Sequence, residues 1–269
     1  MAIATNDDRI GAAKQLVSIL RNSSFTTLAA TLFTTLDVAG NPGAGSLNIG
    51  NTANGLVPDD TVAGYPSLNA FGGGNTGYLD SVQFGSTVAG RLFLYDRLFN
   101  SGSHAMTPTG TVNLASQPSY SARLPGTLYN GLEIFLEINT VVAASAVTIA
   151  VNYTNEAGTP GRSTGASASL SAFQNRRLVP MPLQAGDRGV QKIEGFTIGG
   201  TAAATGLFNI VVARRLWSNR ALAANGGGFD SGALVNMRQI YDTSALWLVI
   251  QPDSTPSGFP ELMMNIING

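Results

Sequence analysis

The chain has 269 residues, of which 44% are hydrophobic, and a chain of this length can bury a sizeable core. Its 15 basic and 16 acidic residues leave a formal net charge of -1, which is too small to attract a phosphate backbone, so we expect no nucleic-acid partner. The sequence has no cysteine, which excludes disulfides, thiolate zinc sites and cysteine nucleophiles.

The first residues predict an amphipathic helix over residues 6–21. Thr5 and Asp8 resemble a capping pair, and apolar residues recur behind them at helical spacing, at Ile10, Ala13, Leu16, Val17 and Leu20. The apolar stripe could pack on its own domain or bind a partner. This stretch lacks the basic leading segment and long apolar run of a signal peptide, so we expect synthesis in the cytosol.

Residues 25–38 are rich in Thr and Phe and fit an extended or a helical segment. Residues 39–77 then form a long arm that is rich in Gly, Asn and Pro and holds only two charges, Asp59 and Asp60. Ordering such a segment costs about 1 kcal/mol per residue in backbone entropy, so it must lie against something. Its anchors could sit on its own sandwich or on an adjacent subunit: Leu47, Ile49, Leu56, Val57, Tyr65, Leu68 and Phe71.

Strands follow from residue 78 onward, separated by Gly-rich turns. Both faces of the segment at 90–99 are apolar, which predicts a central strand. Pro180 and Pro182 remove ladder donors and place their segment at a sheet edge. The alternation in VTIAVNYTNEAGTPGR, residues 147–162, predicts one arm of a β-hairpin and its turn. Further strands are expected at 78–84, 131–140, 189–200, 206–217, 245–252 and 261–269.

The strand at 131–140 alternates, with Leu132, Ile134, Leu136 and Ile138 inward and Glu133, Glu137 and Asn139 outward. Together these segments predict an all-β fold, an antiparallel β-sandwich of jelly-roll type with an N-terminal helix and a long Gly-rich arm. We expect residues 1–76 to form the helix and arm, and residues 77–269 to form the sandwich. No apolar run near the end exceeds six residues, so we expect no membrane partner.

Catalytic motifs are weak throughout. His104 could join Ser101 or Ser103 and Asp96, but it lies in a Ser/Gly turn too close in sequence to these serines. Glu133 and Glu137 would lie about 13 Å apart along a strand, too far for a glycosidase pair. The glycine run at 72–77 lacks the helix and Lys-Ser/Thr of a phosphate loop. We therefore expect no enzyme and no cofactor.

Metal binding has little support. Calcium held between loops by Asp59, Asp60 or Asp230 is one hypothesis, and solvated turn carboxylates are the other. Surface contact is better supported, because two arginine doublets lie near strand ends, and exposed arginines with aromatics nearby are typical of protein interfaces. Simple solubilising charges are the alternative. With the arm anchors, the candidate interface residues are Leu47, Ile49, Leu56, Tyr65, Phe71, Arg176, Arg177, Arg214, Arg215 and Trp217.

Three segments resemble structural proteins of tailed bacteriophage particles. A YTN-x-x-GTxGR hairpin at Tyr153–Arg162 is followed by a Leu-Pro-Leu-QAGD-x-GV pattern at Leu178–Val190, and residues 77–102 are similar to the sheet segment that precedes them in such proteins. The resemblance covers roughly half the chain and carries no catalytic residues. It implies a jelly-roll virion component made in the bacterial host cytoplasm.

Our leading hypothesis is a capsid decoration or cement protein that bridges neighbouring major capsid subunits. It would also bind copies of itself as a homo-oligomer, with a trimer as one candidate. The arm and the N-terminal helix are the segments expected to reach neighbours. The alternative is a tail or fibre sandwich that binds host glycans through loop aromatics, namely Tyr65, Phe71, Tyr120 and Phe229.

Overall fold

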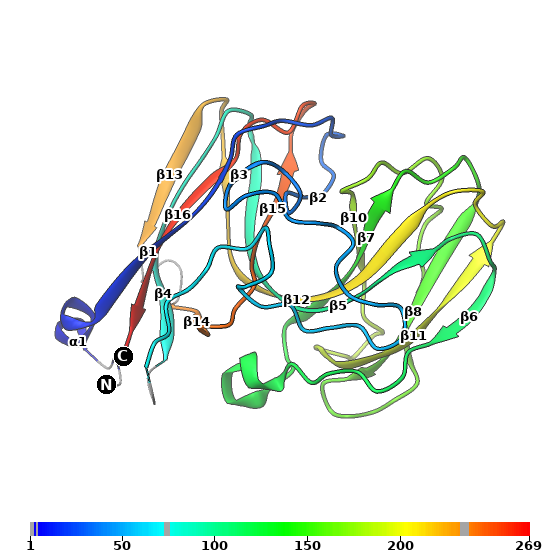
Figure 1. Cartoon of the computed structure of the whole chain (residues 1–269), viewed down its shortest axis with the longest axis horizontal. Helices are drawn as coiled ribbons and strands as arrows, with labels where there is room; N and C mark the ends of the chain where they lie inside the picture. Colours follow the sequence, from blue (N-terminus) through cyan, green and yellow to red (C-terminus); the bar gives the residue numbers. More distant parts are fainter. Residues whose placement is uncertain (1–2, 4, 73–75, 232–236) are drawn as a thin grey trace. The chain divides into compact units, whose positions relative to one another are not determined.

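The computed structural model describes residues 3, 5–72, 76–231 and 237–269. In these ranges the regular secondary structure is almost entirely antiparallel β-strand, and the single α-helix, α1 (Asn6–Gly11), lies near the start (Figure 1). The antiparallel all-β class expected from the sequence is confirmed. No helix within this described part is long and apolar enough to cross a membrane.

The chain divides into two compact units. Unit 1 comprises residues 1–46, 59–96 and 216–269, and unit 2 comprises residues 47–58 and 97–215. Two long strands, β5 (Gly90–Ala105) and β12 (Leu207–Ala221), run from one unit into the other. Neither unit ends at residue 76, so the units combine segments from both sides of the division expected from the sequence.

Unit 1 is a sandwich of two sheets. The first has the order β13-β4-β16-β1-β3, with β14 also paired to β4, and the second contains β15 and β2 beside β5. The bounds are β1 (Ala13–Arg21), β2 (Phe33–Thr34), β3 (Gly40–Asn41), β4 (Gly77–Ser86), β13 (Gly226–Ser231), β14 (Gln239–Ile240), β15 (Leu246–Pro252) and β16 (Glu261–Asn268). Alternate residues of both sheets meet in one buried cluster that includes Val17, Ile19, Val82, Leu94, Leu248 and Met264.

Unit 2 is a second sandwich. One sheet has the order β6-β11-β8-β9, and the other has β10 and β7 beside β12 and β5. The bounds are β6 (Gly110–Asn113), β7 (Leu132–Thr140), β8 (Val147–Asn155), β9 (Arg162–Ala166), β10 (Leu178–Met181) and β11 (Val190–Gly200), with short 3-10 turns at Ser121–Arg123 and Pro125–Thr127. Its core includes the four inward residues predicted on β7 and the predicted stripe on β8: Val147, Ile149, Val151 and Tyr153.

Several strand predictions are confirmed. β5 lies between β12 and β15, as its two apolar faces indicated, and β10 with Pro180 lies at a sheet edge. β8 and β9 form the predicted hairpin, with Tyr153 opposite Arg162. Residues 25–38, left open by the sequence, are extended or irregular and include β2.

The predicted helix over residues 6–21 is wrong beyond its first turns. Thr5 and Asp8 do form a capping box, but the helix ends at Gly11 and β1 begins at Ala13. Antiparallel pairing with β16 overrides the weak helical spacing, because it buries Val17 and Ile19 on the core face at alternate positions. Leu16, which the helical pattern placed on the buried stripe, is therefore 70% exposed.

Candidate functional site

The residues that carry the sequence resemblance come together around one carboxylate in unit 2. Arg162 donates from Nε and Nη2 to the two oxygens of Asp187 at 3.0 and 2.9 Å. Tyr153 donates its hydroxyl to Asp187 at 2.6 Å, and Asn155 donates its amide at 2.9 Å. The backbone N–H of Gln184 donates to the Tyr153 hydroxyl at 2.7 Å. The two motifs thus join the β8-β9 hairpin to the loop at residues 184–187 through hydrogen bonds and an ion pair.

The Arg162 guanidinium holds the pKa of Asp187 well below its usual range, and the bonds from Asn155 and Tyr153 act in the same direction. A carboxylate whose pKa is lower in the folded chain stabilises the fold above the unfolded pKa, about 3.9, and this stability is lost as the pH falls through the folded pKa. We expect Asp187→Asn to unfold at lower urea concentration at pH 7 and to lose less further stability between about pH 5 and pH 3 than the parent chain. Urea midpoints across this range test the prediction; parallel pH curves for the two proteins would contradict it.

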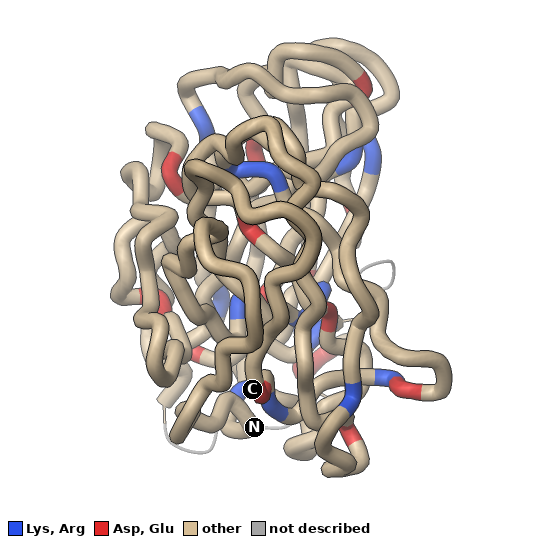
Figure 2. The backbone as a smooth tube through the Cα atoms, turned by 90° about the vertical axis from the view of Figure 1, so that its right-hand side faces the viewer, with Lys and Arg blue, Asp and Glu red and all other residues tan. Residues whose placement is uncertain are grey.

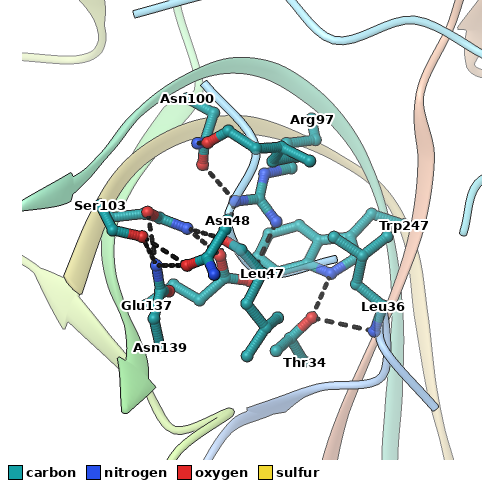
Figure 3. A network of polar contacts seen from close by, with 12 residues as sticks. Thr34, Leu36, Leu47, Asn48, Arg97, Asn100, Ser103, Glu137, Asn139 and Trp247 are labelled. Atoms are coloured by element: carbon teal, nitrogen blue, oxygen red, sulfur yellow. Dashed lines mark hydrogen bonds and ion pairs between the residues drawn. The ribbon is translucent and has the colours of Figure 1, made fainter. Parts of the chain in front are cut away.

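A second polar cluster in unit 2 lies beneath residues 47–58, a segment of the arm that we call the strap (Figure 3). Arg97 donates from Nη1 and Nη2 to the carboxylate of Glu137 at 2.9 and 2.6 Å, and both side chains are fully buried. Asn209 donates one amide hydrogen to Glu137 at 2.8 Å and the other to the carbonyl of Leu47 at 2.7 Å.

Further bonds hold the strap along its length. Asn100 accepts a bond from Arg97 and donates one to the carbonyl of Ile49. The backbones of Asn100 and Leu56 exchange two hydrogen bonds, at 2.8 and 2.9 Å. Since the strap covers this face, the predicted outward placement of Glu137 and Asn139 is wrong: their exposures are 0% and 8%. This part of the arm therefore packs on its own sandwich, and contact of its anchors with an adjacent subunit stays a prediction.

His104 lies in a buried, aromatic environment. Ser101 Oγ lies 2.9 Å from His104 Nε2, but both residues are buried, and the imidazole packs against the rings of Phe196 and Phe208, which also contact each other. Burial lowers the pKa of His104 to about 4, so the ring is neutral at pH 7. Asp96 is buried in unit 1, where its carboxylate accepts bonds from Ser244 and the Ala245 backbone.

The three aspartates considered for calcium have local roles. Asp59 accepts from the backbone of Thr61 at 3.0 Å, and Asp60 accepts from the backbone of Leu68 at 2.8 Å. Asp230 accepts from Trp217 at 2.7 Å and from Asn219 at 2.8 Å. Within the described ranges, no group of three or more His, Asp or Glu side chains is placed to hold a metal ion. Gly73 and Gly74 of the glycine run lie outside those ranges.

The candidate interface residues are divided between the two units, and half of them are shielded. Tyr65, Phe71 and Trp217 belong to unit 1, and the other seven belong to unit 2. The buried members are Leu47, Tyr65, Phe71, Arg214 and Trp217. The half-buried members are Ile49, Leu56, Arg176 and Arg177, and Arg215 is exposed. Arg177 stacks on the ring of Phe173, 3.5 Å from its centroid. Contact with a partner through these residues stays a prediction.

Sequence reasoning missed the outer face of the β13-β4-β16-β1 sheet in unit 1. On this face, opposite the core, strand register places Phe229, Gln83, Met263 and Ser18 in one row across the sheet. The next row is Ser231, Ser81, Asn265 and Leu16, so neither row carries a charge. Leu16 and Phe229 are 70% and 62% exposed. We call these two rows the outer face.

The comparisons with known proteins assign neither a family nor a function to the chain. No family model matches the chain, and no curated protein matches it. Among solved structures, the infectious bursal disease virus VP2 subviral particle aligns at 9% identity with a TM-score of 0.20, over 96% of this chain and 80% of that chain. The structure of the infectious bursal disease virus Gx strain aligns at 10% identity with a TM-score of 0.19, over 96% and 80%. Such scores are too low to assign a fold family or a function.

Proposed function

We propose that this chain is a structural component of a bacteriophage particle, a capsid decoration or cement protein that binds the capsid lattice and bridges neighbouring major capsid subunits. The observation that carries the proposal is the outer face, where Leu16 and Phe229 are exposed and neither of the two rows holds a charge. Uncharged, partly apolar surface is the composition of an interface core. The sequence resemblance to virion proteins supports the same class of function.

The area of this sheet favours many weak contacts over one strong contact. Four strands about 4.8 Å apart and eight residues long at about 3.4 Å per residue give a face of about 500 Å². A stable pairwise interface buries about 800 Å² on each partner, so a face of this size suits a contact that symmetry repeats over a lattice. Linked contacts then raise the effective concentration and the occupancy of every copy.

The charge pattern fits the same task. Figure 2 shows acidic and basic positions interspersed along the chain, in keeping with 12% charged residues and a net charge of -1. Copies of such a chain repel each other little when they are crowded on one particle. Homo-oligomer formation on the lattice is part of the proposal.

The test is a charge placed on the outer face. Leu16→Lys should reduce occupancy on bare phage capsids about tenfold, because the contact would have to desolvate the ammonium group. Leu222→Lys is the matched control, since Leu222 is 84% exposed and lies outside the two rows. Co-sedimentation of each purified variant with capsids measures occupancy. Parent-like occupancy of the Leu16 variant would refute this contact, as would an equal loss in both variants.

The tail or fibre alternative loses most of the loop aromatics that were expected to bind glycans. Three of its four loop aromatics are buried, with exposures of 3% for Tyr65, 6% for Phe71 and 2% for Tyr120. Phe229 alone of the four is open to solvent.

A further inference from the structure

A depression of about 610 Å³ lies on unit 1 where β4 and β13 meet the start of β16. Its volume is within the range of small-ligand sites. The described residues that line it are Gln83–Thr87, Asn225–Phe229, Phe259 and Glu261.

Glycines keep the centre of this depression free of side chains. Gly227 of β13 pairs with Gly85 of β4, and Gly85 also pairs with Glu261 of β16. A Cβ on Gly85 would lie 2.6 Å from Oε1 of Glu261, so the carboxylate extends over the glycine. The floor is therefore backbone with one carboxylate held across it.

Two exposed aromatic rings belong to the same depression. Phe229 is 62% exposed and Phe259 is 46% exposed. β-pairing with Gln83 fixes the backbone of Phe229, and the Thr87 hydroxyl accepts a bond of 2.8 Å from the Phe259 N–H. Exposed aromatic rings on fixed backbone offer a ligand an apolar surface.

The polar lining determines the class of ligand. Gln83 and Asn225 provide amide donors and acceptors, and Glu261 provides a carboxylate acceptor. The described lining residues include no Lys, Arg or His, so an anionic ligand would meet an uncompensated carboxylate. A hydrocarbon ligand would leave these polar groups unpaired. A neutral sugar has hydroxyls for the amides and carboxylate and an apolar C–H face for a ring.

We propose that this depression binds a short neutral oligosaccharide. A sugar ring stacks on Phe229 or Phe259, and its hydroxyls bond to Gln83, Asn225 and Glu261. Phe229 and Gln83 also belong to the outer face, so a copy bound to a capsid through that face would not offer them to a sugar. Sugar binding is therefore measured on the purified chain without capsids, where its failure is distinct from a loss of capsid occupancy.

The experiment applies the purified full chain to an array of neutral and acidic oligosaccharides, then titrates the neutral oligosaccharide with the strongest signal by calorimetry. We expect saturable binding that the Phe229→Ala, Phe259→Ala double variant weakens at least about tenfold, and the two single variants identify the ring that carries the stacking contact. Leu222→Ala is the control for loss of an exposed apolar side chain and should bind like the parent. Thermal melting verifies that each variant is folded.

Three results would overturn the proposal. The first is that no neutral oligosaccharide on the array binds the chain, and the second is that acidic oligosaccharides bind more strongly than neutral ones. The third is that a folded Phe229→Ala, Phe259→Ala double variant binds with the affinity of the parent chain.

Discussion

Replacing Glu137 by alanine is expected to destabilise the fold by about 3–5 kcal/mol, because it leaves the Arg97 guanidinium buried without its counter-charge. Both side chains of the pair are fully buried, and the ion pair is bidentate. The Asn209 amide, which also holds the strap at Leu47, loses its carboxylate acceptor in the same variant. Urea unfolding at pH 7 measures the loss, and the strap should become sensitive to protease in otherwise native conditions.

Glu133 provides the matched control on the same strand and face. It lies two alternations from Glu137, and its side chain is 35% exposed, with the 52% exposed Arg215 at 3.5 Å. An ion pair as exposed as this contributes at most about 1 kcal/mol to stability. The Glu133→Ala variant should therefore unfold at nearly the same urea concentration as the parent chain. Equal losses for the two variants would show that burial beneath the strap does not govern the effect.

A third variant separates the effect of the buried charges from the effect of side-chain volume. Replacing the pair together, as Arg97→Met with Glu137→Leu, removes both buried charges while keeping similar volume. Such exchanges are often neutral or stabilising, so the double variant should recover much of the stability lost by Glu137→Ala. The residual cost should come from Asn100 and Asn209, which the exchange leaves without their charged partners.

The contrast between Glu133 and Glu137 shows where sequence reasoning ends. Alternation places the two carboxylates on one face of β7, and the structure agrees. Whether that face meets water depends on the strap, which lies some 80 residues earlier in the chain and has no regular pattern of its own. Local periodicity contains no information about such a cover, so the face could be predicted and its burial could not.

The N-terminal segment illustrates the opposite error. Thr5 and Asp8 predicted the helix start correctly, because a capping box is a local interaction. The continuation to residue 21 failed because Leu16, Val17 and Leu20 fit a period of 3.6 residues while the β16 pairing imposes a period of two. That pairing joins strands near the two ends of the described chain, so a local sequence pattern cannot predict it. The outer face was missed for the same reason, since Leu16 belongs to it only once β1 is a strand.

The sequence showed the motif around Asp187 as a pattern, but it did not show which contacts the motif makes. Spacing alone gave no reason for Tyr153 and Asp187, 34 residues apart, to occur together, and the hydrogen bond between them supplies it. The glycan hypothesis lacked similar detail. Loop aromatics were pooled by type, but their burial separates Phe229 from Tyr65, Phe71 and Tyr120.

Trp217→Ala is expected to destabilise unit 1 by about 3–5 kcal/mol, the cost of removing a large side chain from a packed core. Its sequence context suggested an interface residue. The structure leaves 5% of it exposed, with its ring 5.2 Å from the Phe84 ring and its indole N–H donated to Asp230 at 2.7 Å. Trp217→Phe keeps the ring and removes the N–H, so it should lose the donor to Asp230, worth about 1 kcal/mol, in addition to some packing.

Stability and capsid binding together distinguish the two roles of Trp217. A core residue changes the urea midpoint and leaves the capsid affinity of the remaining folded protein unchanged, whereas an interface residue does the reverse. Arg215→Ala is the control two positions away, because that side chain is 52% exposed and its replacement should cost less than about 1 kcal/mol. Near-parent stability of Trp217→Ala would contradict its burial. Because the loss of the Trp217 contact with Phe84 lowers the fraction of folded protein, capsid binding must be compared at equal concentrations of folded protein.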